Sequence, residues 1–258
     1  MTTTNFKSVP INDVDVLYQE NGDGDIPLLM IHGYPGRPQD FRWLNPLLKS
    51  HFTMFQIALP GMGYTDVSAC PAVSISERCS FLRQFVDALG LQKCWILGHS
   101  ISGPLAVAMA VADPQRFPKI ILLSAVGLKP HKAYRSLPPQ FLYRITSLPV
   151  IRTLLTPLWK VQFTMMGFPR GITHQTIHHV MACAYGFQFA EQQRNIEALT
   201  SPTMVIWSDD DPLIEPHIQQ ELAEKTPDGP IINFKTGGHN PQKTQAEAIA
   251  KAIIGWKS

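Results

Sequence analysis

The chain has 258 residues, of which 45% are hydrophobic and 16% are charged, and its formal net charge is +2 at pH 7. This length suits one α/β domain with an insertion, and a charge so close to zero excludes a general affinity for nucleic acid. No apolar stretch approaches the roughly 20 residues of a membrane span, and the N-terminus lacks the apolar core of a secretion signal. We therefore expect a globular protein of the cytoplasm.

Strand-like and helix-like segments alternate along most of the chain, which predicts βαβ crossovers and a mostly parallel sheet with helices on both faces. Strands are expected over residues 14–19, 28–31, 52–59, 94–97, 119–124, 203–207 and 231–234. Helices are expected over residues 41–48, 76–89, 104–112 and about 243–256, with Asp40 and Ser74 capping the first two. In such a fold the functional site lies at the carboxyl ends of the strands.

The alternation stops between Gly127 and about Glu197, where no strand is predicted and prolines separate several helix-like runs. This segment has eight basic residues against two acidic ones. The basic residues could contact a membrane surface, steer an anionic substrate, or simply lie on solvated helix faces. Most of the large apolar residues here are expected to form the segment's own core: Leu142, Ile145, Leu148, Ile151, Leu154, Leu155, Leu158, Trp159, Phe163, Met165, Met166 and Phe168.

The sequence GHSISG at residues 98–103 joins the strand expected at 94–97 to the helix expected from Pro104. A serine at such a junction lies on a sharp turn, with its oxygen exposed in front of a helix N-terminus, as in a nucleophile elbow. Gly98 and a small residue at position 102 let the strand and the helix approach each other. Ser102 stands where the G-x-S-x-G pattern has glycine, and Gly103 follows it. Ser100 is therefore the candidate nucleophile.

A carboxylate follows the strand expected at 203–207, where three aspartates occur in a row. Asp211 precedes Pro212 and two apolar residues, which indicates a chain that turns back into the protein. Asp209 and Asp210 are expected to lie in a solvated loop. Asp211 is therefore preferred as the carboxylate that orients a catalytic base.

His239 follows the strand expected at 231–234 and two glycines, so it can reach across the sheet edge. It completes the chain order Ser, Asp, His and is the candidate base that accepts the proton of Ser100. Surface or capping roles are expected for His32, His51, His131, His174, His178, His179 and His217.

A glycine-rich turn, His32 to Gly36, follows the strand expected at 28–31. Such a turn can direct a backbone N–H group at an oxyanion, and the N–H of Tyr34 is the candidate. The N–H of Ile101, the residue after the nucleophile, is the candidate second donor.

These motifs resemble those of the α/β-hydrolase superfamily along nearly the whole chain. Residues 59–66 resemble its strand-end loop, and residues 207–212 resemble its W-G-x-x-D-P acid loop, which selects Asp211 and has Ser208 in a glycine position. The turn at residues 32–36 resembles the H-G-x-P version of epoxide hydrolases and haloalkane dehalogenases. Those enzymes use an aspartate nucleophile where this chain has Ser100, which argues for acyl chemistry instead.

The resemblance implies a mostly parallel sheet of the eight-stranded type, with residues 1–126 and 198–258 as the hydrolase core and residues 127–197 as a helical cap. It also implies that Gly33, Gly98 and Gly103 are structural residues at the site. The four cysteines, Cys70, Cys79, Cys94 and Cys183, have no zinc-like spacing and are expected to be reduced thiols. Neither a metal nor a cofactor is expected.

The function expected is that of a serine hydrolase that cleaves a small hydrophobic carboxylic ester through an acyl-enzyme. Three alternatives remain open: a carbon–carbon bond hydrolase with the same triad, an acyltransferase, and a non-catalytic binding protein of the same fold. The sequence leaves the oligomeric state open.

Overall fold

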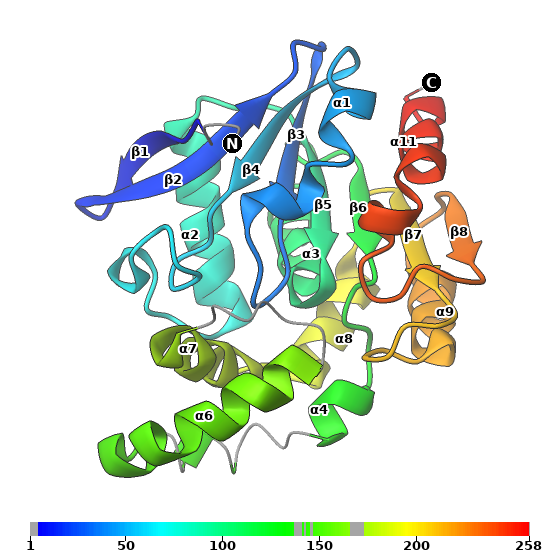
Figure 1. Ribbon diagram of the computed structural model, residues 1–258. Coiled ribbons are helices and arrows are strands. Elements are labelled where there is room, and N and C mark those ends of the chain that lie inside the picture. Colours follow the sequence, from blue (N-terminus) through cyan, green and yellow to red (C-terminus); the bar gives the residue numbers. More distant parts are fainter. Residues whose placement is uncertain (1–4, 137–140, 142, 145–146, 166–172, 258) are drawn as a thin grey trace.

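The computed structural model describes residues 5–136, 141, 143–144, 147–165 and 173–257 (Figure 1). Within these ranges eight strands form one sheet in the order β1-β2-β4-β3-β5-β6-β7-β8. The strands are β1 (Lys7–Ile11), β2 (Val14–Asn21), β3 (Ile26–Ile31), β4 (Phe52–Ile57), β5 (Trp95–His99), β6 (Ile120–Leu123), β7 (Thr203–Ser208) and β8 (Ile231–Phe234). β2 pairs antiparallel with β1 and β4, and all other pairs are parallel. The mostly parallel, eight-stranded prediction is confirmed; β1 was not predicted.

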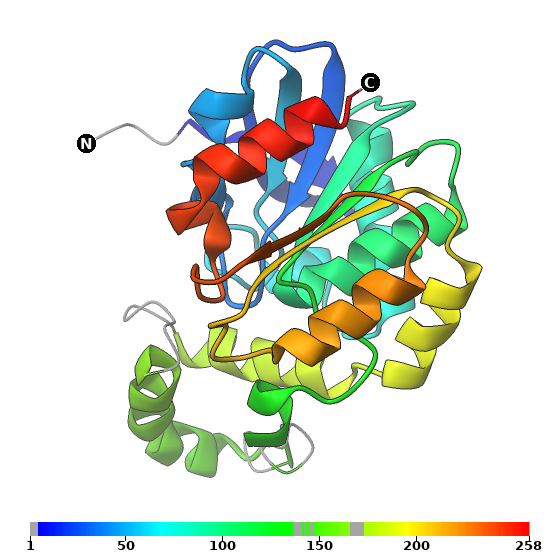
Figure 2. The ribbon, with the colours of Figure 1, turned by 90° about the vertical axis from the view of Figure 1, so that its right-hand side faces the viewer.

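Helices cover both faces of the sheet (Figure 2). The helices of one face are α2 (Ile75–Ala88), α3 (Gly103–Ala112), α8 (Phe189–Ala198) and α9 (Pro216–Lys225), and those of the other are α1 (Asn45–Leu48) and α11 (Ala246–Gly255), with α10 (Pro241–Thr244) preceding α11. Leu28 and Met30 pack toward α1 and α11, whereas Leu29 and Ile31 pack toward α2 and α3. Because successive residues of a strand face opposite sides, a strand covered on both sides is apolar throughout.

The helix expected over residues 41–48 is wrong as a single element. A 3-10 turn, η1 (Pro38–Phe41), is followed by the separate short helix α1. Pro46 lies in the first turn of α1, where its missing N–H costs nothing, so it starts a helix rather than continuing one. Asp40 is also not the N-cap of a helix, since its side chain accepts a hydrogen bond from the Arg37 N–H at 3.0 Å. Ser74 does cap α2, because its Oγ accepts from the Glu77 N–H at 3.3 Å.

The segment between β6 and β7 contains α4 (Lys132–Ser136), α6 (Pro149–Met165), α7 (His174–Tyr185) and α8, and its described residues form no strand. α4, α6 and α7 form a layer beyond one end of the sheet (Figures 1 and 2). α7 packs closely on the loop after β4. Gly61 lies there with φ of +77°, and a Cβ atom on it would stand 2.7 Å from Cδ2 of His179.

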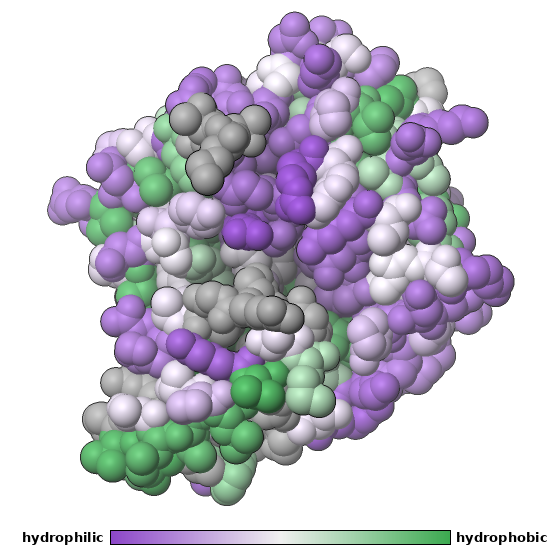
Figure 3. Space-filling model, in the orientation of Figure 1, coloured by the Kyte–Doolittle hydropathy of each residue, from purple (hydrophilic) through white to green (hydrophobic). Residues whose placement is uncertain are grey.

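α6 corrects the expectation that the large apolar residues of this segment are mostly buried. Trp159 is buried, but five apolar side chains on α6 are between 58% and 84% exposed: Val150, Leu154, Leu158, Val161 and Met165. Leu148, just before the helix, is exposed as well. A hydrophobic patch is visible over α6 in Figure 3. The helix is apolar on more than one face, and it can bury only the face that contacts its neighbours. Leu142, Ile145, Met166 and Phe168 lie outside the described residues.

The four cysteines are buried and free of disulfides. Burial raises the pKa of the Cys79 thiol to about 11 and that of Cys94 to about 12, so both are neutral thiols at pH 7. No helix among the described residues has the length and apolar character needed to cross a bilayer.

Candidate active site

Ser100 lies on a strained turn between β5 and α3. Its φ is +57°, a value that few residues other than glycine adopt, and it begins the short 3-10 helix η3 (Ser100–Ser102) that leads into α3. A Cβ atom at Gly98 would lie 2.5 Å from the Ser102 carbonyl oxygen, and one at Gly103 would lie 2.4 Å from the Ala125 Cβ. Both glycines are therefore required by the close packing of the elbow.

Ser102 makes a hydrogen bond that a glycine could not make. The side chain is fully buried, and its Oγ donates to the backbone carbonyl of His32 at 2.6 Å. His32 directly follows β3 and begins the glycine-rich turn. The departure from the G-x-S-x-G pattern thus links the elbow to the loop that carries Tyr34.

Ser100, His239 and Asp211 are joined by two hydrogen bonds across 139 residues of sequence. The His239 Nε2 lies 2.8 Å from the Ser100 Oγ, and the His239 Nδ1 lies 2.8 Å from the Asp211 Oδ2. A carboxylate accepts hydrogen bonds, so it favours the tautomer with the proton on Nδ1 and leaves Nε2 free to accept the serine proton. The three residues follow β5, β7 and β8 at one end of the sheet.

The Asp211 carboxylate is held by its own loop. Its Oδ1 accepts the backbone N–H groups of Leu213 at 2.8 Å and Ile214 at 3.2 Å. Burial alone would raise the pKa of this carboxyl, but His239 and the two N–H groups outweigh it, and the pKa is lowered. Asp211 is therefore ionised at neutral pH, which is the state in which a carboxylate can orient a histidine.

The neighbouring aspartates do more than the sequence indicated. Asp210 is exposed as expected, but its Oδ1 accepts the N–H groups of Gly237 at 2.9 Å and Gly238 at 2.7 Å, directly before His239. Asp209 accepts from Asn233 at 2.7 Å and Lys235 at 3.0 Å. These bonds fix the loop that carries His239. The two glycines before His239 are the sequence feature that indicates the contact with Asp210, because their backbone N–H groups need acceptors.

His99 is a residue of this site that the sequence did not single out. It is buried, and its Nε2 lies 2.9 Å from the His239 carbonyl oxygen, so that nitrogen is protonated and donates. Burial, reinforced by the nearby His239, holds the pKa of His99 far below its usual range. A neutral His99 thus holds the backbone of His239 through this hydrogen bond.

Three other histidines correct the expectation of surface or capping roles. His32 is fully buried; its Nε2 accepts the Leu59 N–H at 3.1 Å, so its Nδ1 donates to the Gly33 carbonyl at 2.8 Å. His131 is half-buried and contacts the Leu213 carbonyl at 3.1 Å, and His179 is buried on α7. Burial lowers the pKa of each of these three to about 4. His174 and His217 are exposed, in line with the expectation.

The two candidate oxyanion donors lie on opposite sides of Ser100 in the chain. A Cβ atom at Gly33 would be 3.0 Å from the His99 Nδ1 and 3.1 Å from the Ser100 Cβ, so the backbone leading into Tyr34 passes directly beside Ser100. Ile101 is in the first turn of η3, where N–H groups have no partner within the helix. Both N–H groups are therefore suited to bind an oxyanion formed at Ser100.

A family described as alpha/beta hydrolase fold matches residues 26–246. The chain belongs to this family. A curated relative, the 2-hydroxy-6-oxononadienedioate/2-hydroxy-6-oxononatrienedioate hydrolase of Cupriavidus pinatubonensis, is 24% identical over 98% of this chain and 94% of its own length. The uncharacterized hydrolase YugF of Bacillus subtilis is 20% identical over 94% of each chain.

Solved structures show the same fold at low sequence identity. A putative lipase from Acinetobacter baumannii has a TM-score of 0.77 and 20% identity, and it covers 97% of this chain and 90% of its own. A meta-cleavage product hydrolase from Pseudomonas fluorescens has a TM-score of 0.69 and 19% identity over 97% and 96% of the two chains. The haloalkane dehalogenase DbeA from Bradyrhizobium elkani has a TM-score of 0.78 and 17% identity over 98% and 97%. Within the described ranges, no group of three or more His, Cys, Asp or Glu side chains could hold a metal ion.

Proposed function

We propose that this protein is a serine hydrolase that cleaves a carboxylic ester through an acyl-enzyme on Ser100. The observation that carries the proposal is the pair of 2.8 Å hydrogen bonds that join Ser100 to His239 and His239 to Asp211. The strained backbone of Ser100 supports it, because such strain persists where the surrounding structure enforces it and is frequent at catalytic residues.

In the proposed reaction, the Ser100 Oγ attacks the ester carbonyl while the His239 Nε2 takes its proton. Asp211 keeps the proton of His239 on Nδ1 and stabilises the imidazolium. The N–H groups of Tyr34 and Ile101 bind the oxyanion. His239 then protonates the leaving alkoxide, and water cleaves the acyl-enzyme by the same steps.

Ester cleavage is preferred because the leaving group needs nothing beyond a proton, and His239 lies in position to supply one. His99, the other ring within 5.2 Å of His239, is neutral and already hydrogen-bonded to a carbonyl, so it is no second acid. We also propose that residues 127–197 serve as a cap over this site. The helices α4, α6 and α7, which lie beyond one end of the sheet, support that role.

A second candidate is carbon–carbon bond hydrolysis with the same three residues. It is favoured by the relative from Cupriavidus pinatubonensis, which matches almost the full length of both chains. That relative is named as a hydrolase of 2-hydroxy-6-oxo dioates. The leaving group would then be a carbanion, so the substrate itself would have to delocalise the charge before His239 protonates it.

The test is labelling with a fluorophosphonate probe, together with turnover of short-chain p-nitrophenyl esters and of a 2-hydroxy-6-oxo dienoic acid. We expect wild type to be labelled and to hydrolyse the esters, and Ser100→Ala to do neither. Turnover of the dienoic acid without the esters would favour carbon–carbon cleavage. Absence of labelling in correctly folded wild type would reject an activated serine and both candidates.

A further inference from the structure

A buried arginine without a counter-ion lies next to Tyr34. Arg78, on α2, is 4% exposed, and its Nη2 has no hydrogen-bond partner. Among the described residues it forms no ion pair with an aspartate or a glutamate. An arginine stays charged even when buried, and a buried charge without a partner is strongly unfavourable. Its retention in the core therefore indicates that the charge has a role, such as binding an anion.

The groups around Arg78 are neutral at pH 7. Burial raises the pKa of the Tyr34 hydroxyl and the thiol pKa values of Cys70 and Cys183, so none of them becomes an anion. Burial, with a contribution from Arg78, lowers the pKa of His179 to about 4. The guanidinium Cζ lies 4.4 Å from the centroid of the Tyr34 ring, which explains its orientation but supplies no negative charge. The surroundings thus retain one uncompensated positive charge.

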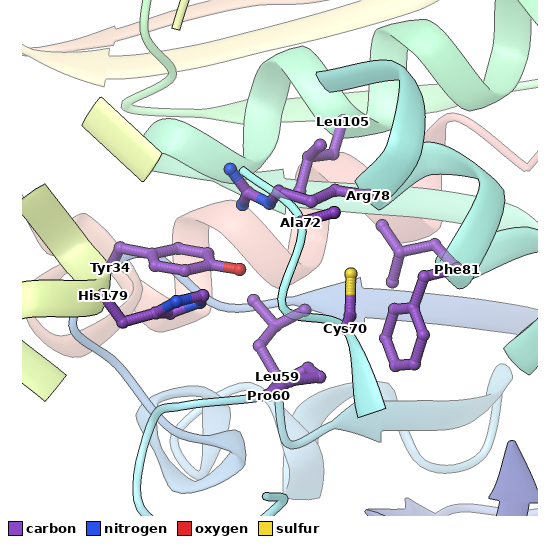
Figure 4. Close-up of a pocket in the computed structure, with 10 residues that line it drawn as sticks. Tyr34, Leu59, Pro60, Cys70, Ala72, Arg78, Phe81, Leu105 and His179 are labelled. Carbon is purple, nitrogen blue, oxygen red and sulfur yellow. The ribbon is translucent and has the colours of Figure 1, made fainter. Parts of the chain in front are cut away.

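A small cavity adjoins this charge (Figure 4). Its volume of about 10 Å³ is close to the minimum for one water molecule, and so for one carboxylate oxygen. Figure 4 shows Tyr34 between the guanidinium of Arg78 and the ring of His179. The remaining walls are apolar or weakly polar: Leu59, Pro60, Cys70, Ala72, Phe81, Leu82 and Leu105.

The cavity lies between the hydrolase core and the proposed cap. Arg78 comes from α2 and Leu105 from α3, while His179 comes from α7. Tyr34 takes part in both places, since its ring lines the cavity and its N–H is a candidate oxyanion donor. Tyr34 is therefore the residue that connects the cavity with the proposed reaction centre.

We propose that Arg78 binds a free carboxylate of the substrate, at the end remote from the bond that is cleaved. One carboxylate oxygen enters the cavity and accepts a hydrogen bond from the Arg78 Nη2. The substrate class is then a monoester of a dicarboxylic acid, or a related carbonyl compound with a second, free carboxylate. This inference rests on the proposed function, because both groups belong to one molecule.

The competing explanation is that Arg78 merely packs on Tyr34 and holds the oxyanion loop in shape. The two explanations differ in selectivity. A packing role would affect every ester alike, whereas a carboxylate-binding role would affect anionic substrates far more than neutral ones.

The test compares monomethyl with dimethyl esters of adipic, pimelic and suberic acid, which match in length and differ in charge. For at least one length we expect wild type to prefer the monoanion in kcat/KM. Arg78→Met should lower the ratio of anionic to neutral kcat/KM by about 10- to 100-fold, the range typical of a hydrogen bond to a charged group. Arg78→Lys should give an intermediate ratio, because it keeps the charge but loses the planar fork.

The matched control is Arg83→Met, which removes an exposed arginine from the same helix and should leave the ratio unchanged. A wild type without preference for any monoanion would overturn the proposal, as would an equal loss on both substrates in Arg78→Met. If Arg78→Met does not fold, Arg78→Lys and the wild-type ratios decide.

A binding measurement separates this proposal from the proposed function. Calorimetry of the monomethyl esters with Ser100→Ala should show binding that is lost in Ser100→Ala/Arg78→Met. Binding without turnover in wild type would reject the ester hydrolase and keep the carboxylate site. Turnover of neutral esters without any preference for the monoanions would do the reverse.

Discussion

The triad and the Arg78 cavity are two buried polar regions that differ in whether their polar groups have partners within the protein. Around Ser100, every polar side-chain atom of the triad has a partner: Ser100 with His239, His239 with Asp211, and Asp211 with two backbone N–H groups. Beside Tyr34, the guanidinium of Arg78 has an aromatic ring and neutral thiols around it but no anion. The first region is complete without a ligand, and the second is not.

The difference indicates what each region contributes. A fully paired network holds its own geometry, so it is ready for chemistry before a substrate arrives. An unpaired charge lowers the stability of the free protein and is compensated when an anion binds. In the proposed function, reaction and recognition therefore have separate structural origins.

The comparison is tested most severely by Asp211→Asn. An amide at this position would stabilise the wrong tautomer of His239, so kcat should fall by about 10³- to 10⁴-fold. Ester turnover measures the loss, and circular dichroism checks the fold. The control is Asp209→Asn, which changes the same charge two residues away and should have a far smaller effect. Similar losses in both variants would show that the whole loop, rather than Asp211, is responsible.

Lowering the pH should destabilise the folded protein through three histidines whose pKa values are lowered by burial. The folded-state pKa values of His32, His131 and His179 are lowered to about 4. Between about pH 6.5 and 4 the unfolded chain therefore binds more protons than the folded one, and the free energy of unfolding should fall as the pH drops through this window. Each such histidine should lower the free energy of unfolding by on the order of 3 kcal/mol by pH 4. The measurement is urea denaturation at several pH values. The free energy of unfolding should depend less steeply on pH in His179→Gln than in wild type, whereas His217→Gln, at an exposed position, should match wild type.

Removing the unpaired charge should stabilise the protein. We expect Arg78→Met to raise the free energy of unfolding by about 1–3 kcal/mol, as replacement of buried charges by apolar residues of similar volume often does. Chemical denaturation measures the change, with Arg83→Met near zero as the reference. A clear loss of stability would mean that the contact with Tyr34 outweighs the cost of the buried charge.

The smallest effect is expected from Asp210→Ala. This change removes the acceptor of the Gly237 and Gly238 N–H groups, which are in contact with solvent and can bind water instead. We therefore expect a loss of about 1 kcal/mol in stability and a modest fall in kcat from the loosened His239 loop. An effect as large as that of Asp211→Asn would contradict a supporting role.

The elements that the sequence predicted well depend on local patterns. β3, β5, β6 and β7 are buried on both faces and appear as short apolar runs, and the elbow at residues 98–103 has a recognisable spacing. The order of Ser100, Asp211 and His239 was visible because each residue lies in the loop or turn that follows a strand. The helix expected at 41–48 failed because its proline opens a new helix.

The features that could not be predicted depend on contacts between distant segments. Arg78 occupies a core-facing position of α2, between Ile75 and Leu82, and a charge at that spacing is a signal that periodicity alone cannot interpret. Its neighbours come from the turn after β3, the loop after β4, α3 and α7. The bond from Ser102 to His32 and the roles of His99 and Asp210 are likewise set by tertiary packing.

Gly61 has a consequence for how closely α7 approaches the rest of the fold. Because Gly61 has no side chain, the loop after β4 passes so close to His179 that a Cβ atom at this position would stand 2.7 Å from the His179 Cδ2. In a chain of the same fold with a larger residue at this position, α7 would have to lie farther from the loop after β4. The size of residue 61 thus limits how closely α7 can approach the loop after β4, and it does so without any contact to Ser100, Asp211 or His239.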